Sequence, residues 1–201
     1  MVEQVTKRKL YHVTETKPYK NAFTAGEIVR IGGAYNPFFS FYELAREYPV
    51  TENGATVLVK AKDWLRRVRD KTILTTPDIH ARIAVEVAEH YVMLCRELLM
   101  EEIRREEFGS KPPSRQSCLF ACETVQEARD WIPLVGSNGL ICELNCTGTI
   151  HRADSRLLLG DSEPLSITRD RARAYWRGEM SEHPRAETLV VGNVVVSAVG
   201  L

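Results

Sequence analysis

The stretch ETLVVGNVVVSAVG, residues 187–200, decides that the end of the chain belongs to a sheet. Its β-branched residues favour strands, and Gly192 followed by Asn193 interrupts the apolar run near its middle. The pattern predicts two strands that meet at this dipeptide, or one bent strand. Glu187 immediately precedes the apolar run, so its carboxylate is either a solvated strand end or a group held at a pocket.

Two further strands are expected upstream of this segment. The sequence SCLFACE predicts a strand from Cys118 that contains Phe120, and GLICELNCTG, residues 139–148, predicts another. Between them, TVQEARDWIPLV predicts a helix with Thr124 as N-cap, because Glu127 follows three residues later as in a capping box. A lone aromatic such as Phe120 usually packs in the core.

The N-terminal segment predicts a strand over residues 8–14. His12 and Thr14 fall on one face of this strand, about 6–7 Å apart. A hydrogen-bonded core histidine beside a capping threonine is one interpretation, and a polar site on the inner face is the other. A short strand near residues 27–31 and a short helix after Asn36 follow.

The middle of the chain is predicted to be helical. Thr76 fits an N-cap, Pro77 a first-turn position and Gly109 a stop, which predicts one long helix. Residues 55–70 fit a strand or a helix. Six apolar residues recur at three- and four-residue spacing along the long helix and predict its buried face: Ile79, Ile83, Val87, Tyr91, Leu94 and Leu98. We therefore expect an α+β fold, one domain over residues 1–201 with a helical insertion at about 55–112.

Composition limits the classes of partner. The 27 basic and 27 acidic residues cancel, so net charge does not indicate a nucleic acid or a membrane. There is no apolar run of membrane-spanning length and no secretory signal, and five cysteines fit reduced thiols, so a cytoplasmic protein is expected. Two groups of basic residues form either solvated helix faces or a groove for a phosphate backbone: Arg66, Arg67, Arg69 and Lys71, then Arg104, Arg105, Lys111 and Arg115.

The cysteine spacing does not predict a metal site. Cys118 and Cys122, like Cys142 and Cys146, are four residues apart on predicted strands. Such positions lie about 13 Å apart, whereas zinc needs its sulfurs within about 4 Å of one another. Phosphate-binding glycine loops, nucleophile elbows and H-E-x-x-H are also missing from the sequence.

Three segments in order resemble the ADP-ribosyltransferase superfamily, in its His-Tyr-Glu branch. LYHVTETKPYKNAFTAGEIV is similar to the first motif strand, in which histidine is followed by Thr or Ser, and to the later G-[DE]-x-[IL] segment. CLFACETVQEARDWI is similar to the second motif, and AETLVVGNVVV to the third, a Glu that opens a strand. Rifampin ADP-ribosyltransferases, poly(ADP-ribose) polymerases and DarT-type toxins share this layout. The resemblance implies a split β-sheet core, and it leaves the helical middle uncovered.

The resemblance also implies roles for individual residues. His12 would bond a ribose hydroxyl of NAD, Thr14 would contact the adenosine ribose, and the backbone of Val13 would hold the nicotinamide amide. Phe120 or Tyr42 would stack on the nicotinamide ring. The family has glycine where Val13 stands and tyrosine where Phe120 stands, so this chain keeps a stacking ring and loses a hydroxyl.

The resemblance makes Glu187 the catalytic carboxylate. From their charge, Arg115 and Lys111, with Arg104 and Arg105, would either guide an RNA or DNA strand or bind the NAD pyrophosphate. Breaking the nicotinamide–ribose bond builds positive charge on the ribose, which a carboxylate bonded to the 2′-hydroxyl stabilises. No metal is needed, and NAD is the co-substrate.

The expected function is mono-ADP-ribosyl transfer to a macromolecule, with RNA or DNA ahead of protein. A bacterial toxin or a phage-defence effector, with a cognate antitoxin as partner, fits this activity, and no membrane is expected. The alternatives are an NAD glycohydrolase, in which water is the acceptor, and a catalytically silent module that binds NAD or nucleic acid.

Overall fold

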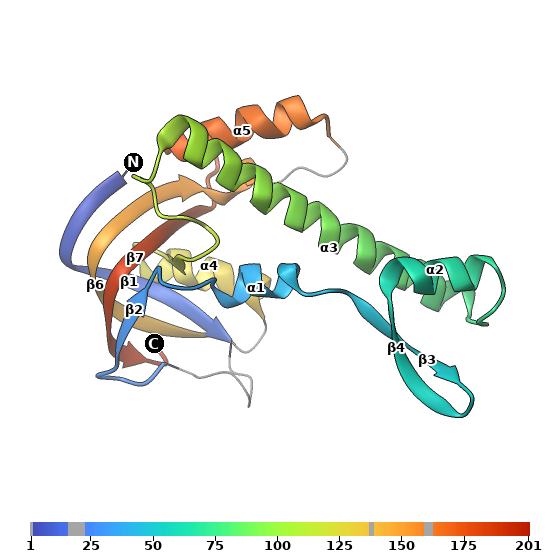
Figure 1. Cartoon of the computed structure of the whole chain (residues 1–201). Helices are drawn as coiled ribbons and strands as arrows, with labels where there is room; N and C mark the ends of the chain where they lie inside the picture. Colours follow the sequence, from blue (N-terminus) through green and yellow to red (C-terminus); the bar gives the residue numbers. More distant parts are fainter. Residues whose placement is uncertain (1, 16–22, 137–138, 159–162) are drawn as a thin grey trace. The chain divides into compact units, whose positions relative to one another are not determined.

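The structure is a computed structural model that describes residues 2–15, 23–136, 139–158 and 163–201. The chain divides into two compact units (Figure 1). One unit combines Met1–Asn36 with Glu97–Leu201, and the other is the inserted segment Pro37–Arg96. None of the helices in the described ranges is long and apolar enough to cross a membrane.

The first unit is built on an antiparallel sheet with the strand order β1-β6-β7-β2. Its strands are β1 (Val2–Glu15), β2 (Ile28–Ile31), β6 (Gly139–Asp154) and β7 (Ala186–Val199). The short strand β5 (Leu119–Ala121) pairs with β7 and continues into a bridge between Cys122 and Tyr11 of β1. The sheet therefore closes on itself through β5.

The predicted alternatives for residues 187–200 resolve to one bent strand. β6 and β7 pair along almost their whole length, and Figure 1 shows both as long curved ribbons. Gly148 pairs with Gly192 at the bend, and both glycines have a positive φ. A Cβ atom on Gly148 would overlap the backbone of Val191, and one on Gly192 would overlap that of Thr147. The two glycines let the backbones approach closely where the strands curve.

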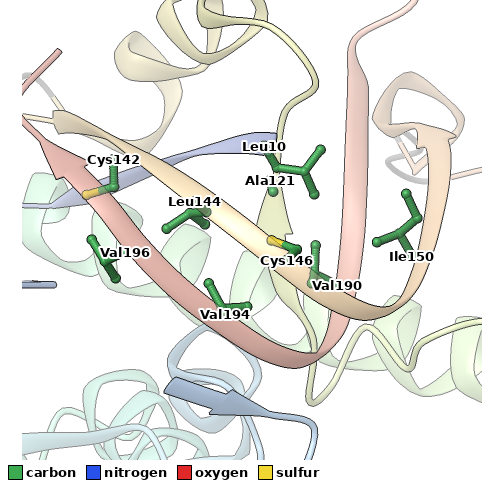
Figure 2. Close-up of a cluster of buried hydrophobic side chains, with 9 residues drawn as sticks. All are labelled: Leu10, Ala121, Cys142, Leu144, Cys146, Ile150, Val190, Val194 and Val196. Atoms are coloured by element: carbon green, nitrogen blue, oxygen red, sulfur yellow. The ribbon is translucent and has the colours of Figure 1, made fainter. Parts of the chain in front are cut away.

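Apolar side chains pack on both faces of β7. Nine buried residues form what we call the strand core (Figure 2): Leu10, Ala121, Cys142, Leu144, Cys146, Ile150, Val190, Val194 and Val196. On the other face Leu189 packs with Cys118, Ala153, Tyr175 and Trp176, in what we call the helix core. Neighbouring residues Leu189 and Val190 belong to different cores, as the alternation of side chains along a strand requires.

Helices cover the sheet of the first unit. They are α4 (Val125–Val135), α5 (Leu165–Arg177), the 3₁₀ turn Ser155–Leu158, and the end of α3 (Pro77–Ile103), which continues as a π-helical turn over Arg104–Phe108. Thr124 caps α4, because its side chain accepts a hydrogen bond from the Glu127 backbone. This bond confirms one half of the predicted capping box. In the other half, the Glu127 carboxylate accepts a hydrogen bond from the backbone N–H of Glu123, and a capping box would have that of Thr124.

The second unit has its own core. It contains α1 (Pro37–Glu43), the hairpin of β3 (Glu47–Glu52) and β4 (Ala55–Lys60), α2 (Ala61–Arg69) and the first part of α3. Val50, Trp64 and Ile83 are its buried centre. The expected insertion at about 55–112 therefore differs from the observed unit in bounds and in content. The observed unit begins earlier because it contains α1 and the hairpin, and it ends earlier because α3 from Glu97 onward belongs to the first unit.

The α+β class and the long helix that begins at Pro77 are confirmed. The predicted buried face of that helix is wrong in part. Ile79, Tyr91 and Leu98 are between 40% and 48% exposed, whereas polar side chains take buried positions. The buried positions are Ile83, His90, Glu97, Met100, Glu101, Ile103 and Arg104. Hydrogen bonds and ion pairs compensate for the burial of the charged members.

Candidate functional site

Glu187 lies at the start of β7 and is 5% exposed. Its Oε1 atom accepts a hydrogen bond of 2.6 Å from the Tyr175 hydroxyl of α5. Arg115 donates to the same oxygen through Nη1, so the carboxylate forms a buried ion pair. Glu187 is therefore a group held in the interior and not a solvated strand end.

Arg115 joins a second buried carboxylate to this group. Its Nε donates to Glu97 at 2.9 Å and its Nη2 donates to the other Glu97 oxygen at 3.3 Å. The guanidinium carbon lies 5.0 Å from the centre of the Phe120 ring and 5.2 Å from that of Tyr175. We call Glu97, Arg115, Phe120, Tyr175 and Glu187 the carboxylate cluster.

Burial and charge act against each other in the carboxylate cluster. Burial lowers the pKa of Arg115, but the carboxylates of Glu187 and Glu97 outweigh it, and the pKa is raised well above its ordinary value. Burial also raises the pKa of the Tyr175 hydroxyl well above 10, so Tyr175 is a neutral hydrogen-bond donor. Two carboxylates facing one guanidinium give a formal charge of −1, which is costly in an interior.

The segment that carries Arg115 is held by a second polar group. Arg104 donates to both Glu101 oxygens and to the carbonyls of Gly109 and Pro112. Ser114 donates to Glu101 at 2.9 Å. These bonds tie the turn after the long helix to the helix itself, and they place the backbone that leads into Arg115.

The segment that leads into Glu187 is fixed by a buried aspartate. Asp154 accepts hydrogen bonds from the backbones of Arg156, Ser181 and Arg185 and from the Ser181 hydroxyl. Trp131 adds a bond of 3.0 Å from its indole to the carbonyl of Ala186, which directly precedes Glu187. Asp154 therefore fixes the backbone at Arg185, and Trp131 fixes it at Ala186, just before Glu187.

His12 is bonded to the strand that carries Phe120. Its Nδ1 atom lies 2.7 Å from the Phe120 carbonyl oxygen, and its ring meets Phe23 edge-on at 5.3 Å. Burial lowers the pKa of His12, and the Phe120 carbonyl opposes this in part. The neutral ring therefore donates its Nδ1 proton to the carbonyl, which leaves Nε2 as an acceptor.

His12 and Glu187 point to opposite faces of the sheet. Directly paired residues share a face, and His12 pairs with Cys142 of the strand core. Glu187 pairs with Ala153 of the helix core. The structure therefore brings Arg115, Phe120 and Glu187 together, and it links His12 to them through the Phe120 backbone.

The other predicted site residues lie elsewhere. Val13 is 8% exposed and packs with Cys122, Ala128 and Ile141. Thr14 is half-buried in β1. Tyr42 belongs to the Pro37–Arg96 unit, where its ring lies 5.3 Å from that of His90.

Two of the basic residues assigned either to solvated helix faces or to a groove belong to neither. Arg104 and Arg115 are buried in ion pairs with glutamates, because each is drawn into the interior by a buried carboxylate. Arg105 and Lys111 stay exposed, although Arg105 also pairs with Glu101. In the other group, Arg67 pairs with Glu52 and Arg69 with Asp70.

The cysteines of the sheet are packing residues. Cys142 and Cys146 lie in the strand core, and burial raises the pKa of Cys146 to about 12. Burial likewise raises the pKa of Cys122 to about 12. These groups are therefore neutral thiols. Among the described residues, no three metal-binding side chains come close enough to hold an ion.

Sequence reasoning missed Glu97 and Tyr175. A usable signal exists for Glu97, because it falls seven residues after His90 and four before Glu101, on one face of the long helix. Tyr175 carries no such signal, since aromatic residues on a short helix usually pack in a core.

No curated protein matches this chain. A family model described as "Protein of unknown function (DUF2441)" matches residues 10–199, which span β1 to β7 and contain the whole carboxylate cluster. The chain belongs to the DUF2441 family.

Proposed function

We propose that this protein is an NAD-dependent ADP-ribosyltransferase that modifies a macromolecule. The observation that carries the proposal is the meeting of three sequence-distant motif strands. Tyr11 and Cys122 exchange two backbone hydrogen bonds, and Phe120 pairs with Leu189. The strands that carry His12, Phe120 and Glu187 are therefore neighbours, and Phe120 and Glu187 share one face of the sheet.

Glu187 is the proposed catalytic residue. A carboxylate at the ribose 2′-hydroxyl stabilises the positive charge that develops when the nicotinamide bond breaks. The Tyr175 hydroxyl, 2.6 Å from Glu187, orients this carboxylate and supplies at the site the hydroxyl that Phe120 lacks. Phe120 lies on the same face of the sheet and offers a ring for stacking against the nicotinamide.

Activity requires that Arg115 first release Glu187. Arg115 and Glu187 are 4% and 5% exposed, so their ion pair must separate before a substrate reaches the carboxylate. The NAD pyrophosphate is a stronger partner for a guanidinium than a single carboxylate, because it offers paired anionic oxygens. Binding of NAD would thus draw Arg115 away and release Glu187.

His12 takes a different role from the one its sequence motif implies. Because its side chain faces the strand core, it does not share a face with Glu187. It is a positioning residue that holds the Phe120 carbonyl at 2.7 Å and thereby the backbone beneath the stacking ring.

The proposed acceptor is nucleic acid ahead of protein, in the setting of a toxin or a phage-defence effector. Arg105 and Lys111 are the exposed basic residues near the start of the segment that leads to Arg115. Contacts between such residues and phosphates weaken as salt rises. Single-strand affinity that does not change between 50 and 200 mM salt, about the range over which such contacts weaken, would count against this acceptor.

A catalytically silent binding module is the second candidate, and the enclosure of Glu187 favours it. In this function the carboxylate cluster stabilises the fold and NAD or nucleic acid binds without turnover. An NAD glycohydrolase would use the same site with water as acceptor.

One experiment separates these functions. The protein is incubated with NAD labelled in its adenylate, with cell RNA, DNA or protein, and compared with Glu187→Gln. Label in one macromolecular fraction supports transfer, free ADP-ribose indicates hydrolysis, and unchanged NAD indicates a silent module. Glu187→Gln keeps the shape of the side chain and removes its charge. Circular dichroism of both proteins checks that the variant is folded like the wild type.

A further inference from the structure

Apolar side chains form a stripe on the exposed side of α3, the long helix drawn in green in Figure 1. Val85, Tyr91 and Val92 are between 42% and 54% exposed, and they follow one another along the helix instead of being scattered. Contiguous apolar surface of this kind is typical of an interaction site. What we call the stripe consists of six residues of the Pro37–Arg96 unit: Ala81, Val85, Ala88, Tyr91, Val92 and Cys95.

The stripe has the spacing of a helix–helix seam. From Ala81 to Cys95, all its members except the tyrosine are alternately four and three residues apart. A seven-residue repeat of this form keeps one seam against a second helix over several turns. At about 3.6 residues per turn, Val85 and Val92 point away from Ile83, which is buried in the core of the unit. The core of the unit therefore does not use this seam, and a second helix can occupy it.

Residues of opposite charge lie on one edge of the stripe. Arg82 and Glu89 are seven residues apart on this edge, and the side chain of Arg82 is 63% exposed. Arg82 donates to Glu86 of its own helix at 2.7 Å, and a guanidinium has further N–H groups for a second carboxylate. The other edge carries Ala84 and Tyr91. An edge with one cation and one anion complements itself when a second copy runs in the opposite direction.

We propose that the stripe pairs with the stripe of a second copy of this chain, with the two α3 helices antiparallel and centred on residues 86–87. Each valine of the seam then faces an alanine: Val85 meets the partner's Ala88, and Val92 meets the partner's Ala81. Large side chains opposite small ones let the two helices approach closely and interdigitate.

The same register joins opposite charges. Arg82 lies beside the partner's Glu89, and the two-fold symmetry of the pair repeats this contact at the other end of the interface. On the other edge, Tyr91 covers the partner's Ala84. Every residue in the interface belongs to the Pro37–Arg96 unit, so the proposal stands apart from the carboxylate cluster.

Other arrangements of the two helices fit less well. Centring the pair on residue 90 would set Glu89 against the partner's Glu89, and like charges repel. Centring it on residues 93–94 would need Leu99 opposite the partner's Ala88, but Leu99 packs against the helix core of the first unit. Parallel helices would set the charged edge of each copy against the apolar edge of the other.

The test measures self-association of the full-length protein by sedimentation equilibrium between about 2 and 200 µM, a range that brackets a micromolar dissociation constant. We expect a reversible monomer–dimer equilibrium in this range, because one helix from each copy makes a contact below the standard interface of about 1,600 Å². Val85→Glu and Val92→Glu put a charge into the seam, so each is expected to weaken dimerisation at least tenfold. Leu58→Glu, at an exposed leucine of β4 in the same unit, is the matched control and should stay within twofold.

Charge reversal tests the register. Arg82→Glu alone, or Glu89→Arg alone, places like charges beside each other at both ends of the interface and is expected to weaken dimerisation at least fivefold. The double variant Arg82→Glu/Glu89→Arg restores opposite charges across the interface, so its affinity should return to within about threefold of the wild type. Thermal melts establish that each variant is folded.

Cys95 reports the direction of the two helices. It is exposed, whereas the other four cysteines are buried, so a thiol-reactive spin label attaches to it selectively. In the antiparallel pair the two Cys95 residues lie about 25 Å apart along the helices, at roughly 1.5 Å per residue. In a parallel pair they would face each other and form a disulfide on mild oxidation. Cys95→Ser, treated with the same label, shows that the signal comes from this residue.

Four results would overturn the proposal. The first is a wild type that stays monomeric up to about 200 µM, which would leave the stripe to a helix of a different protein. The second is dimerisation within twofold of the wild type in the folded Val85→Glu and Val92→Glu proteins. The third is a double charge variant that dimerises no better than the single ones. The fourth is a Cys95 disulfide or a label distance below about 15 Å, which would make the helices parallel. None of these measurements uses NAD, so the proposed enzyme function is decided separately.

Discussion

Arg115 and Glu187 are 72 residues apart in the chain and form an ion pair in which both side chains are less than one-tenth exposed. Glu97 holds the other edge of the same guanidinium. One arginine therefore pairs with a carboxylate from a helix and with a carboxylate from a strand. Removing it leaves two buried negative charges next to each other.

The loss of Arg115 is expected to be severe for stability. Arg115→Met should lower the free energy of unfolding by about 3–5 kcal/mol, because it leaves two buried carboxylates without their guanidinium partner. Urea denaturation measures this change. In the double variant with Glu187→Gln the loss should be smaller than the sum of the single losses, since one of the orphaned charges is gone.

An exposed arginine serves as the control for Arg115. Arg66→Met should change the free energy of unfolding by no more than about 0.5 kcal/mol. A loss below about 1 kcal/mol in Arg115→Met would contradict the interpretation of the cluster as a tightly coupled buried network.

The carboxylate cluster shows what a sequence can and cannot predict. Glu187 and Phe120 were recognisable because each lies at a fixed place in a strand motif. That both face the helix core depends on the register of β5 and β7, in which Phe120 pairs with Leu189. Register is set by pairings across long sequence separations, and no local pattern in either strand contains it.

Most helices and strands were predictable, because the signals that define them lie within a few neighbouring residues of the sequence. Thr124 and Thr76 accept hydrogen bonds from backbone N–H groups three residues on, as N-caps do. The face of α3 was mispredicted because hydrophobicity was the only guide. Glu101 and Arg104 are buried in a mutual ion pair, and Glu97 is buried in an ion pair with Arg115 of the turn before β5. A count of apolar residues cannot detect such pairs.

Stability is expected to fall in mild acid because of His151. This residue is fully buried, and burial lowers its pKa from 6.5 to about 4, partly opposed by the Tyr175 carbonyl. Between these values the unfolded chain binds a proton that the folded protein does not, so stability decreases as pH falls from 6.5 towards 4. The full difference is about 3 kcal/mol by proton linkage.

Denaturation at pH 7 and pH 5 measures the effect of His151. The wild type should lose about 2 kcal/mol over this interval from this residue, and His151→Gln should lose correspondingly less. His183 is exposed, so His183→Gln should keep the wild-type difference. Equal pH dependence in wild type and His151→Gln would show that other groups dominate.

The bend of β6 and β7 is expected to tolerate no side chain at Gly148. An alanine there would overlap the Val191 carbonyl in a backbone conformation that already disfavours side chains. Gly148→Ala should cost at least about 2 kcal/mol of unfolding free energy. Gly33→Ala meets nothing within 4 Å and is the matched control. Similar stability of the two variants would contradict the close approach at the bend.

The most direct measurement of the account is NAD turnover by wild type and Glu187→Gln with each acceptor fraction. The account predicts nicotinamide release and label in one macromolecular fraction for wild type, with a loss of at least about 100-fold in the folded Glu187→Gln protein, because the carboxylate acts at the charge that develops in the transition state. Unchanged NAD with wild type in every fraction, or equal turnover by both proteins, would contradict it.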